Sequence, residues 1–212
     1  VEYEWAVADR LGLEIEVPMT FNAFSRRNLL DGDLEQVRKP SSRVESLKLA
    51  GQYTFAVSEP WQSSFAFGTI AEIGLPDFES IARGDRLPRD LLYNPFLVIG
   101  KRWGSNWHSL LYTGPRFTKH LTDGHLETGY ECHLSGFYML SNSRNYLGIE
   151  LNQYWRQGRY EVTVRPEMRL EFSESLLAGF APGIPLHSGP DRLSFFLRLV
   201  YEPSHRGKAH KH

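Results

Sequence analysis

Two side chains with the chemistry of a hydrolase lie close together in the sequence, at His133 and Ser135. Residues two apart share one face of a strand, so the imidazole and the hydroxyl would point the same way. Together with Glu150 on the next predicted strand, they would form a Ser-His-Glu set of the kind that cleaves lipid esters. A His-x-Ser pair alone is weak evidence, and the alternation described below aims it at the polar face. We therefore expect no catalytic residues, and a lipid hydrolase that uses Ser135 and His133 stays an alternative hypothesis.

A larger group of charged side chains shares the polar face of the predicted strands. The residues predicted to line a lumen are Glu14, Glu16, Glu131, His133, Glu150, Glu161, Arg165, Glu167, Arg169, Glu171 and Arg198. They could line an open pore, or the glutamates and arginines could pair and plug it, because an unpaired buried charge is costly. The sequence leaves both interpretations open. A further hypothesis joins four of them in an inward charge ladder: Glu161, Arg165, Arg169 and Glu171.

The elements that would position these residues are β-strands, because apolar and polar residues alternate with a period of two. In residues 1–20 the odd positions are mostly apolar, and Ala8-Asp9-Arg10 leaves room only for the tight turn of an antiparallel hairpin. The pattern predicts eleven strands, at 1–7, 11–20, 46–57, 64–75, 95–103, 106–114, 125–140, 145–155, 159–172, 176–181 and 192–202. The predicted fold class is all-β: an antiparallel up-and-down transmembrane β-barrel of about 12 strands, with long extracellular loops and short periplasmic turns.

The connections between these strands alternate in length. Short turns are expected near Asp9, Pro60, Gly104, Asn142 and Glu174, and longer loops at 21–45, 76–94, 115–124 and 182–191. Short turns on one rim and long loops on the other are typical of outer-membrane barrels, although Gln157-Gly158 is a short exception. A helical turn is expected near 33–37. Pro166 lacks an N–H and predicts a bulge or a locally unpaired position in its strand.

Aromatic residues gather near the predicted strand ends. The expected aromatic girdle consists of Tyr3, Trp5, Trp61, Phe65, Trp103, Trp107, Trp155, Phe172 and Tyr201, with Phe21 beside them. Such girdles mark the two interfaces of a membrane. The polar face also has little Lys, whereas a solvated face would usually have more. Both features favour lipid outside and a polar inside. A soluble lipocalin-like barrel or sandwich, which alternates in the same way, is the remaining alternative.

Composition excludes several classes of protein. Lys+Arg 24 against Asp+Glu 25 leaves a net charge of -1, which lacks the electrostatic footprint of a nucleic-acid binder. The single cysteine, Cys132, excludes an internal disulfide and a Cys-rich zinc site. No apolar run approaches the roughly 18 residues of a membrane helix. The sequence has no phosphate loop, nucleophile elbow or haem motif, and its histidines lack metal-ligand spacing, so neither a cofactor nor a metal is expected.

We expect one β-barrel domain at 1–202, followed by a disordered basic tail at 203–212. The chain has no Met start and no leader pattern, which suggests processing or truncation at its front. Bacterial barrels have even strand numbers, yet strand 1–7 would start at the extracellular end. We therefore expect a further strand before Val1, either missing here or supplied by a partner.

The opening segment 1–18, VEYEWAVADRLGLEIEVP, resembles the first hairpin of Gram-negative outer-membrane β-barrel proteins, some of them described as transporters of aromatic-degradation pathways. The segment Leu197–Tyr201 is similar to the terminal-strand signal read by the barrel-assembly machinery, but it ends in Tyr and a tail follows it. The resemblance implies a bacterial outer-membrane location and a barrel fold, but no substrate. Our first hypothesis for the function is a passive channel, porin-like transporter or scaffold. The expected partners are outer-membrane lipid, a small polar solute and a protein of a larger membrane assembly, with no nucleic acid.

Overall fold

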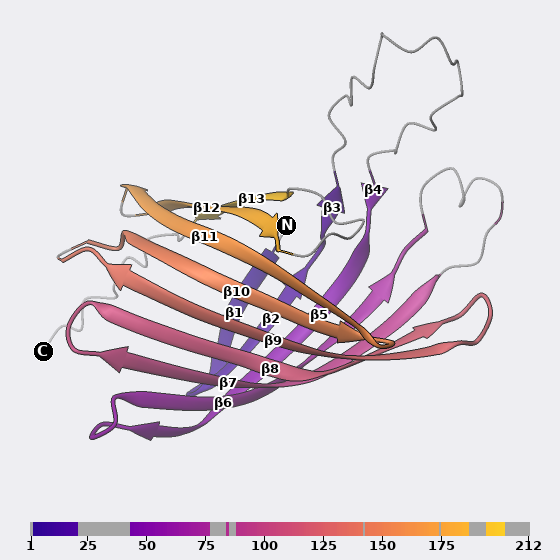
Figure 1. Ribbon diagram of the computed structural model, residues 1–212, viewed down its shortest axis with the longest axis horizontal. Coiled ribbons are helices and arrows are strands. Elements are labelled where there is room, and N and C mark those ends of the chain that lie inside the picture. Colours follow the sequence, from indigo (N-terminus) through magenta and orange to yellow (C-terminus); the bar gives the residue numbers. More distant parts are fainter. Residues whose placement is uncertain are drawn as a thin grey trace, which may run out of the picture. The chain divides into compact units, whose positions relative to one another are not determined.

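The computed structural model describes residues 2–20, 43–76, 84, 88–141, 143–173, 175–186 and 194–201. These residues form an all-β fold in which eleven strands make one antiparallel sheet, as the sequence predicts (Figure 1). The strands pair in chain order from β1 and β2 through β5 to β13, while β3 and β4 form a separate two-stranded sheet. No helix long and apolar enough to cross a membrane occurs in the described part of the chain.

The strands have the following bounds: β1 Glu2–Ala8, β2 Leu11–Glu16, β3 Met19–Thr20, β4 Arg43–Val44, β5 Ser46–Ser58, β6 Ser63–Gly74, β7 Asp90–Trp103, β8 Trp107–His120, β9 Leu126–Met139, β10 Tyr146–Arg156, β11 Arg159–Ser173, β12 Leu176–Pro185 and β13 Ser194–Tyr201. The tight turn predicted between the first two strands is confirmed, and Arg10 has a φ of 64° there.

The structure corrects three predicted bounds at places where a proline interrupts the pattern. β7 begins at Asp90 instead of Pro95, β8 continues through Pro115 to His120, and β12 continues through Pro182 to Pro185. The predicted loop 115–124 is therefore wrong, because only 121–125 connects β8 to β9; the loops predicted at 76–94 and 182–191 also shorten. Each proline removes one ladder hydrogen bond, a loss of about 1 kcal/mol that the paired residues on both sides outweigh.

The predicted strand 11–20 is also wrong as a single element. β2 ends at Glu16, and Met19–Thr20 pairs instead with Arg43–Val44. Pro18 lies between the two pieces, and its carbonyl accepts a hydrogen bond from the Glu45 N–H at 2.9 Å. The helical turn expected near 33–37 and the tail expected at 203–212 lie outside the described residues.

Pro166 produces an unpaired stretch and no bulge, which is one of the two predicted outcomes. In the ladder between β11 and β12, Val164 pairs with Ile184 and Met168 pairs with Phe180. The register is the same on both sides of the gap, so Pro166 lies opposite Pro182. Neither residue has an N–H to donate, and the ladder is open between them.

Spatial proximity divides the chain into two compact units. The first consists of Val1–Tyr53, Gly68–Pro95 and Arg116–Thr128, and the second of Thr54–Phe67, Phe96–Pro115 and Gly129–His212. Strands β10 to β13 belong wholly to the second unit, β1 and β2 to the first, and β5 to β9 are divided between them. The predicted single domain 1–202 stays a prediction.

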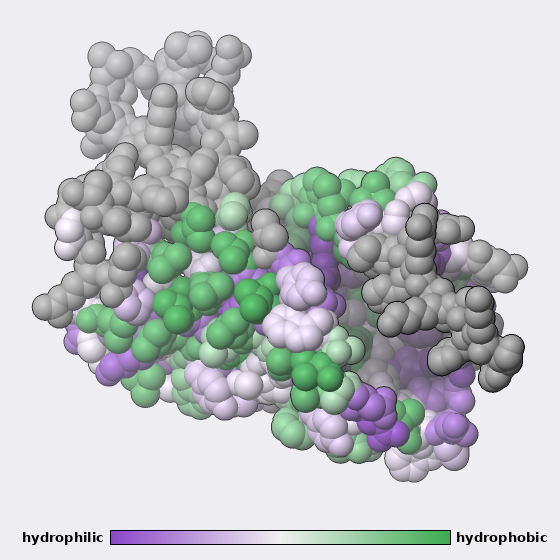
Figure 2. Space-filling model, turned by 180° about the vertical axis from the view of Figure 1, so that it is seen from behind, coloured by the Kyte–Doolittle hydropathy of each residue, from purple (hydrophilic) through white to green (hydrophobic). Residues whose placement is uncertain are grey.

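Burial in this fold is inverted relative to a water-soluble sheet. In β9, Glu131 and Ser135 are 8% and 7% exposed, whereas Tyr130 and Leu134 are 44% and 48% exposed. Among the described residues, the buried apolar side chains are only Ala66, Leu92, Leu177 and Ala178. Figure 2 shows patches of hydrophobic side chains on one face of the molecule. The alternation therefore places polar side chains on the more buried face and apolar ones on the more exposed face.

Glycines on the polar face of the second unit make room for large side chains of neighbouring strands. A Cβ atom on Gly148 would lie 2.8 Å from the Cβ of Phe137, its partner in β9. A Cβ atom on Gly129 would lie 2.8 Å from the hydroxyl of Tyr154. These aromatic side chains thus occupy the space that a larger residue in place of either glycine would need.

We predict that Gly148→Ala lowers the free energy of unfolding by about 1–3 kcal/mol, because the added methyl group overpacks the contact with Phe137. Gly136→Ala is the matched control: a Cβ there meets no atom within 4 Å. It should be neutral or stabilise by up to about 1 kcal/mol, because alanine has less unfolded-state freedom. Urea unfolding of the refolded chain measures both. Equal effects of the two substitutions would contradict this packing.

Candidate functional site

The residues predicted to line a lumen lie mainly on the more buried face of the sheet. All of them are buried or half-buried except Arg198, which is exposed on β13. Glu14 and Glu16 belong to the first unit, and the other nine belong to the second. Their role as lumen-lining residues stays a prediction.

Glu150 lies at the centre of the polar face of the second unit. It pairs with Ser135 on β9 and with Arg165 on β11. The Ser135 hydroxyl donates to Glu150 Oε2 at 3.4 Å. The carboxyl group of Glu167 on β11 lies near that of Glu150, so the two acidic side chains are neighbours on this face.

Arg165 extends from this group across the neighbouring strand. Gly183 on β12 makes the space, because a Cβ atom there would lie 2.9 Å from Arg165 Nη1 and would collide with the hydroxyl of Ser194 on β13. The guanidinium therefore lies over Gly183 and close to the place where β12 pairs with Ser194. Period-two alternation identifies the face of Arg165, but it does not identify the glycine beneath its guanidinium.

Arg169 and Glu171 hold the end of the connection between β9 and β10. Arg169 Nε donates to the Arg144 carbonyl at 3.0 Å, and its guanidinium lies 4.7 Å from the ring centroid of Tyr146. Glu171 accepts from the Arg144 N–H at 3.3 Å, and its own N–H donates to Asn145 Oδ1 at 2.5 Å.

The hypothetical charge ladder along β11 has no support in these contacts. Within the described residues, no ion pair joins any two of Glu161, Arg165, Glu167, Arg169 and Glu171. Arg169 and Glu171 instead contact the connection 143–145. Sequence reasoning missed this role, because residues 25 to 27 positions apart carry no local signal of contact.

The geometry around Ser135 differs from that of a hydrolytic triad. In a triad the serine hydroxyl is hydrogen-bonded to the histidine that takes its proton. Here the Ser135 hydroxyl donates to Glu150, and the His133 ring packs 5.2 Å from that of Tyr112. Tyr112 also donates its hydroxyl proton to Glu131 at 3.0 Å. Ser135 and His133 thus share a face but have different partners.

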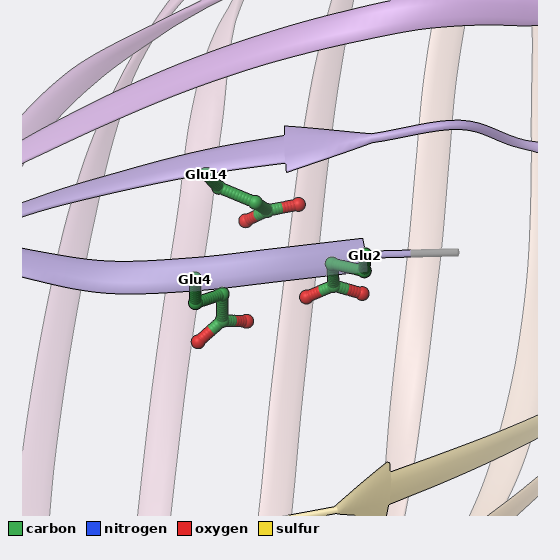
Figure 3. Close-up of side chains that lie close together, drawn as sticks. All are labelled: Glu2, Glu4 and Glu14. Carbon is green, nitrogen blue, oxygen red and sulfur yellow. The ribbon is translucent and has the colours of Figure 1, made fainter.

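Three glutamates gather on the hairpin of the first unit. Glu14 on β2 lies beside Glu2 and Glu4 on β1, with one carboxylate oxygen of each within 4.8 Å of the others (Figure 3). Glu16 differs from them, because it forms an ion pair with Lys48 of β5 at 3.1 Å. Exposed acidic groups at this spacing are common without a metal ion, and the three carboxylates do not constitute a metal site by themselves.

The predicted girdle residues are mostly exposed, with Trp5 and Phe65 half-buried. In the second unit, Trp155 contacts the rings of Tyr130 and Tyr160 at 6.1 and 4.9 Å. Elsewhere in that unit, Trp103 donates to the Ser109 hydroxyl and lies beneath the ammonium group of Lys101. Phe21 lies outside the described residues.

A family model described as HAEPLYID-like matches residues 1–202 of the chain. No curated protein and no solved structure matches the chain. Because that description names no activity, the assignment of function depends on the geometry of the two faces.

We predict that Arg169→Leu destabilises the chain by about 1–3 kcal/mol, because the Arg144 carbonyl loses a charge-assisted hydrogen bond. Arg159→Leu makes the same substitution at an exposed position of the same strand and should stay within about 0.5 kcal/mol. Urea unfolding, combined with limited proteolysis at residues 140–145, measures the effect. Equal losses of stability in the two variants would show that Arg169 is solvated and does not hold the Arg144 carbonyl.

Proposed function

The chain belongs to the HAEPLYID-like family, and we propose that it is a β-barrel of the bacterial outer membrane, with apolar side chains facing lipid and polar side chains facing a lumen. Its activity in this proposal is passive: a porin-like channel for small polar solutes, or a structural scaffold. Joining the sheet edges β1 and β13, directly or through a further strand, is part of the proposal. A twelfth strand stays a prediction.

The observation that carries the proposal is the inverted burial of the two faces. On β10, the apolar Leu147 and Ile149 are 53% and 56% exposed, whereas the next residue, Glu150, is half-buried. Leaving one such apolar side chain half exposed to water costs on the order of 1 kcal/mol relative to full burial. The penalty recurs on strand after strand, and a hydrocarbon environment removes it. A lipocalin-like binding barrel would require the opposite arrangement, with apolar side chains inside.

The length of the strands fits a bilayer. Tyr160 and Phe172, both exposed, lie twelve residues apart on β11. At ~3.3 Å per residue they are about 40 Å apart along the strand, and a tilt of about 40° reduces this to a depth of about 30 Å. That depth matches the hydrocarbon core, with an aromatic side chain at each interface.

The connection lengths support the same proposal less strongly than the sequence suggests. The connections 9–10, 59–62 and 104–106 are short, while 75–89 separates β6 from β7. The predicted loop 115–124, however, shrinks to 121–125.

The alternative function, a lipid hydrolase, receives less support. The Ser135 hydroxyl donates to Glu150, whereas a catalytic serine would be hydrogen-bonded to a histidine.

We predict that the refolded chain needs detergent or lipid to stay monodisperse. It should also migrate differently on denaturing gels before and after heating, because a folded barrel resists unfolding by the detergent in the gel until it is heated. The measurement is size-exclusion chromatography with and without detergent, together with gel mobility. A monodisperse chain in detergent-free buffer would rule out the membrane proposal.

A planar lipid bilayer separates the channel from the scaffold. We expect stepwise increases in conductance on insertion, because charged and polar side chains on the polar face would keep a lumen filled with water. Insertion without conductance, verified by gel mobility after recovery from liposomes, would show that side chains plug the lumen and would favour the scaffold.

A further inference from the structure

Three strand ends of the first unit meet at His120, the last residue of β8. Nδ1 of His120 lies 2.6 Å from Oδ1 of Asp90, the first residue of β7. Nε2 of the same ring lies 3.9 Å from Oε2 of Glu127, near the start of β9. One imidazole therefore stands between carboxylates from both neighbouring strands.

The protonation of the ring decides the sign of the second contact. A neutral imidazole that donates from Nδ1 to Asp90 presents a lone pair at Nε2, and a carboxylate can only accept, so the ring and Glu127 repel each other. The imidazolium carries a proton on both nitrogens and attracts both carboxylates. Histidine is the side chain whose charge changes between about pH 5 and 8. The His120 side chain is 33% exposed, so it exchanges protons with solvent.

We propose that His120 is a proton-operated latch, which ties the ends of β7, β8 and β9 together when protonated and releases Glu127 when it loses its proton. The latch goes beyond the proposed membrane function and does not depend on it, because all three residues belong to one unit of the sheet. It closes as the pH falls and loosens as the pH rises.

Other charged groups lie near the His120 ring and act on it in both of its protonation states. Just before β7, Arg89 Nε donates to the second oxygen of Asp90 at 2.6 Å, which keeps that carboxylate paired in both states. On β8 itself, Lys119 contacts the Gly124 carbonyl, and Arg116 lies four residues before His120 on the same face of the strand.

From the β9 side, the His125 ring lies parallel to His120 with 6.2 Å between centroids. The His125 N–H donates to Asp123 Oδ1 at 2.9 Å, and this hydrogen bond lowers the pKa of Asp123. A second positive charge on His125 would oppose the latch, so Glu127 has to supply the attraction.

Backbone hydrogen bonds at the same edge provide a direct readout. The His120 N–H donates to the His125 carbonyl at 2.9 Å, and the Leu121 N–H donates to the Arg89 carbonyl at 3.0 Å. Both bonds break when the strand ends separate. Hydrogen exchange of these two amides therefore reports the opening of this edge.

The experiment measures hydrogen exchange of the refolded full chain at pH 5.5 and pH 8.0, corrected for the intrinsic rate at each pH. Wild type should open about two- to fivefold less often at pH 5.5, the range expected for a partly exposed ion pair. His120→Gln should lose this pH dependence. Glu127→Gln should lose it at the His120 amide, whose hydrogen bond lies on the β9 side, because a neutral amide can donate to a neutral ring. The Leu121 amide, on the Asp90 side, should keep it. His125→Gln is the matched control and should keep the dependence.

A wild-type chain with the same protection at both pH values would overturn the latch. So would a pH dependence of the His120 amide that survives Glu127→Gln, or one that disappears only in His125→Gln. If either His120→Gln or Glu127→Gln fails to fold, the other variant still decides the outcome.

Discussion

The register of β10 against its two neighbours determines the composition of both faces of the second unit. Glu150 pairs with Ser135 and Arg165, and the adjacent Ile149 pairs with Gly136 and Pro166. A slip of one residue would exchange these rows and bring every charged side chain to the apolar face. The glycines oppose such a slip, because Phe137 has room only while it lies opposite Gly148. Register and packing therefore specify the same arrangement.

Several charged residues of the polar face have local partners among the described residues. Glu131 accepts from Tyr112, Glu16 pairs with Lys48, and Arg169 contacts the connection before β10. This arrangement meets the requirement that buried polar groups have partners, because hydroxyl groups and backbone carbonyls serve as well as opposite charges. On the same face the carboxyl groups of Glu150 and Glu167 are neighbours, and the Arg165 guanidinium beside them lies over Gly183 of β12.

A fold with so few buried apolar side chains needs another source of stability. The backbone ladder supplies hydrogen bonds along the sheet, but each of them contributes only about 1 kcal/mol net in water. In a hydrocarbon environment an unpaired backbone group costs several times more, so the same ladder becomes far more stabilising. The exposed apolar face and the backbone ladder would thus both be more stable in hydrocarbon than in water, which supports the membrane proposal. The contacts of His120 concern strand ends and would operate in either environment.

The sequence by itself determined the all-β class, the number of strands in the sheet and the face of each side chain in the clearly alternating strands, because a period of two is a local property of the chain. It placed Glu131 and Ser135 on the polar face, and the structure has both there. It failed where a proline seemed to end a strand, as at Pro95 and Pro115, because cross-strand pairs on both sides outweigh one lost hydrogen bond. Only the tertiary structure decided the partners. Arg169 meets the Arg144 carbonyl, and His120 meets Asp90, because register brings together residues 25 and 30 positions apart, and no local pattern encodes that register.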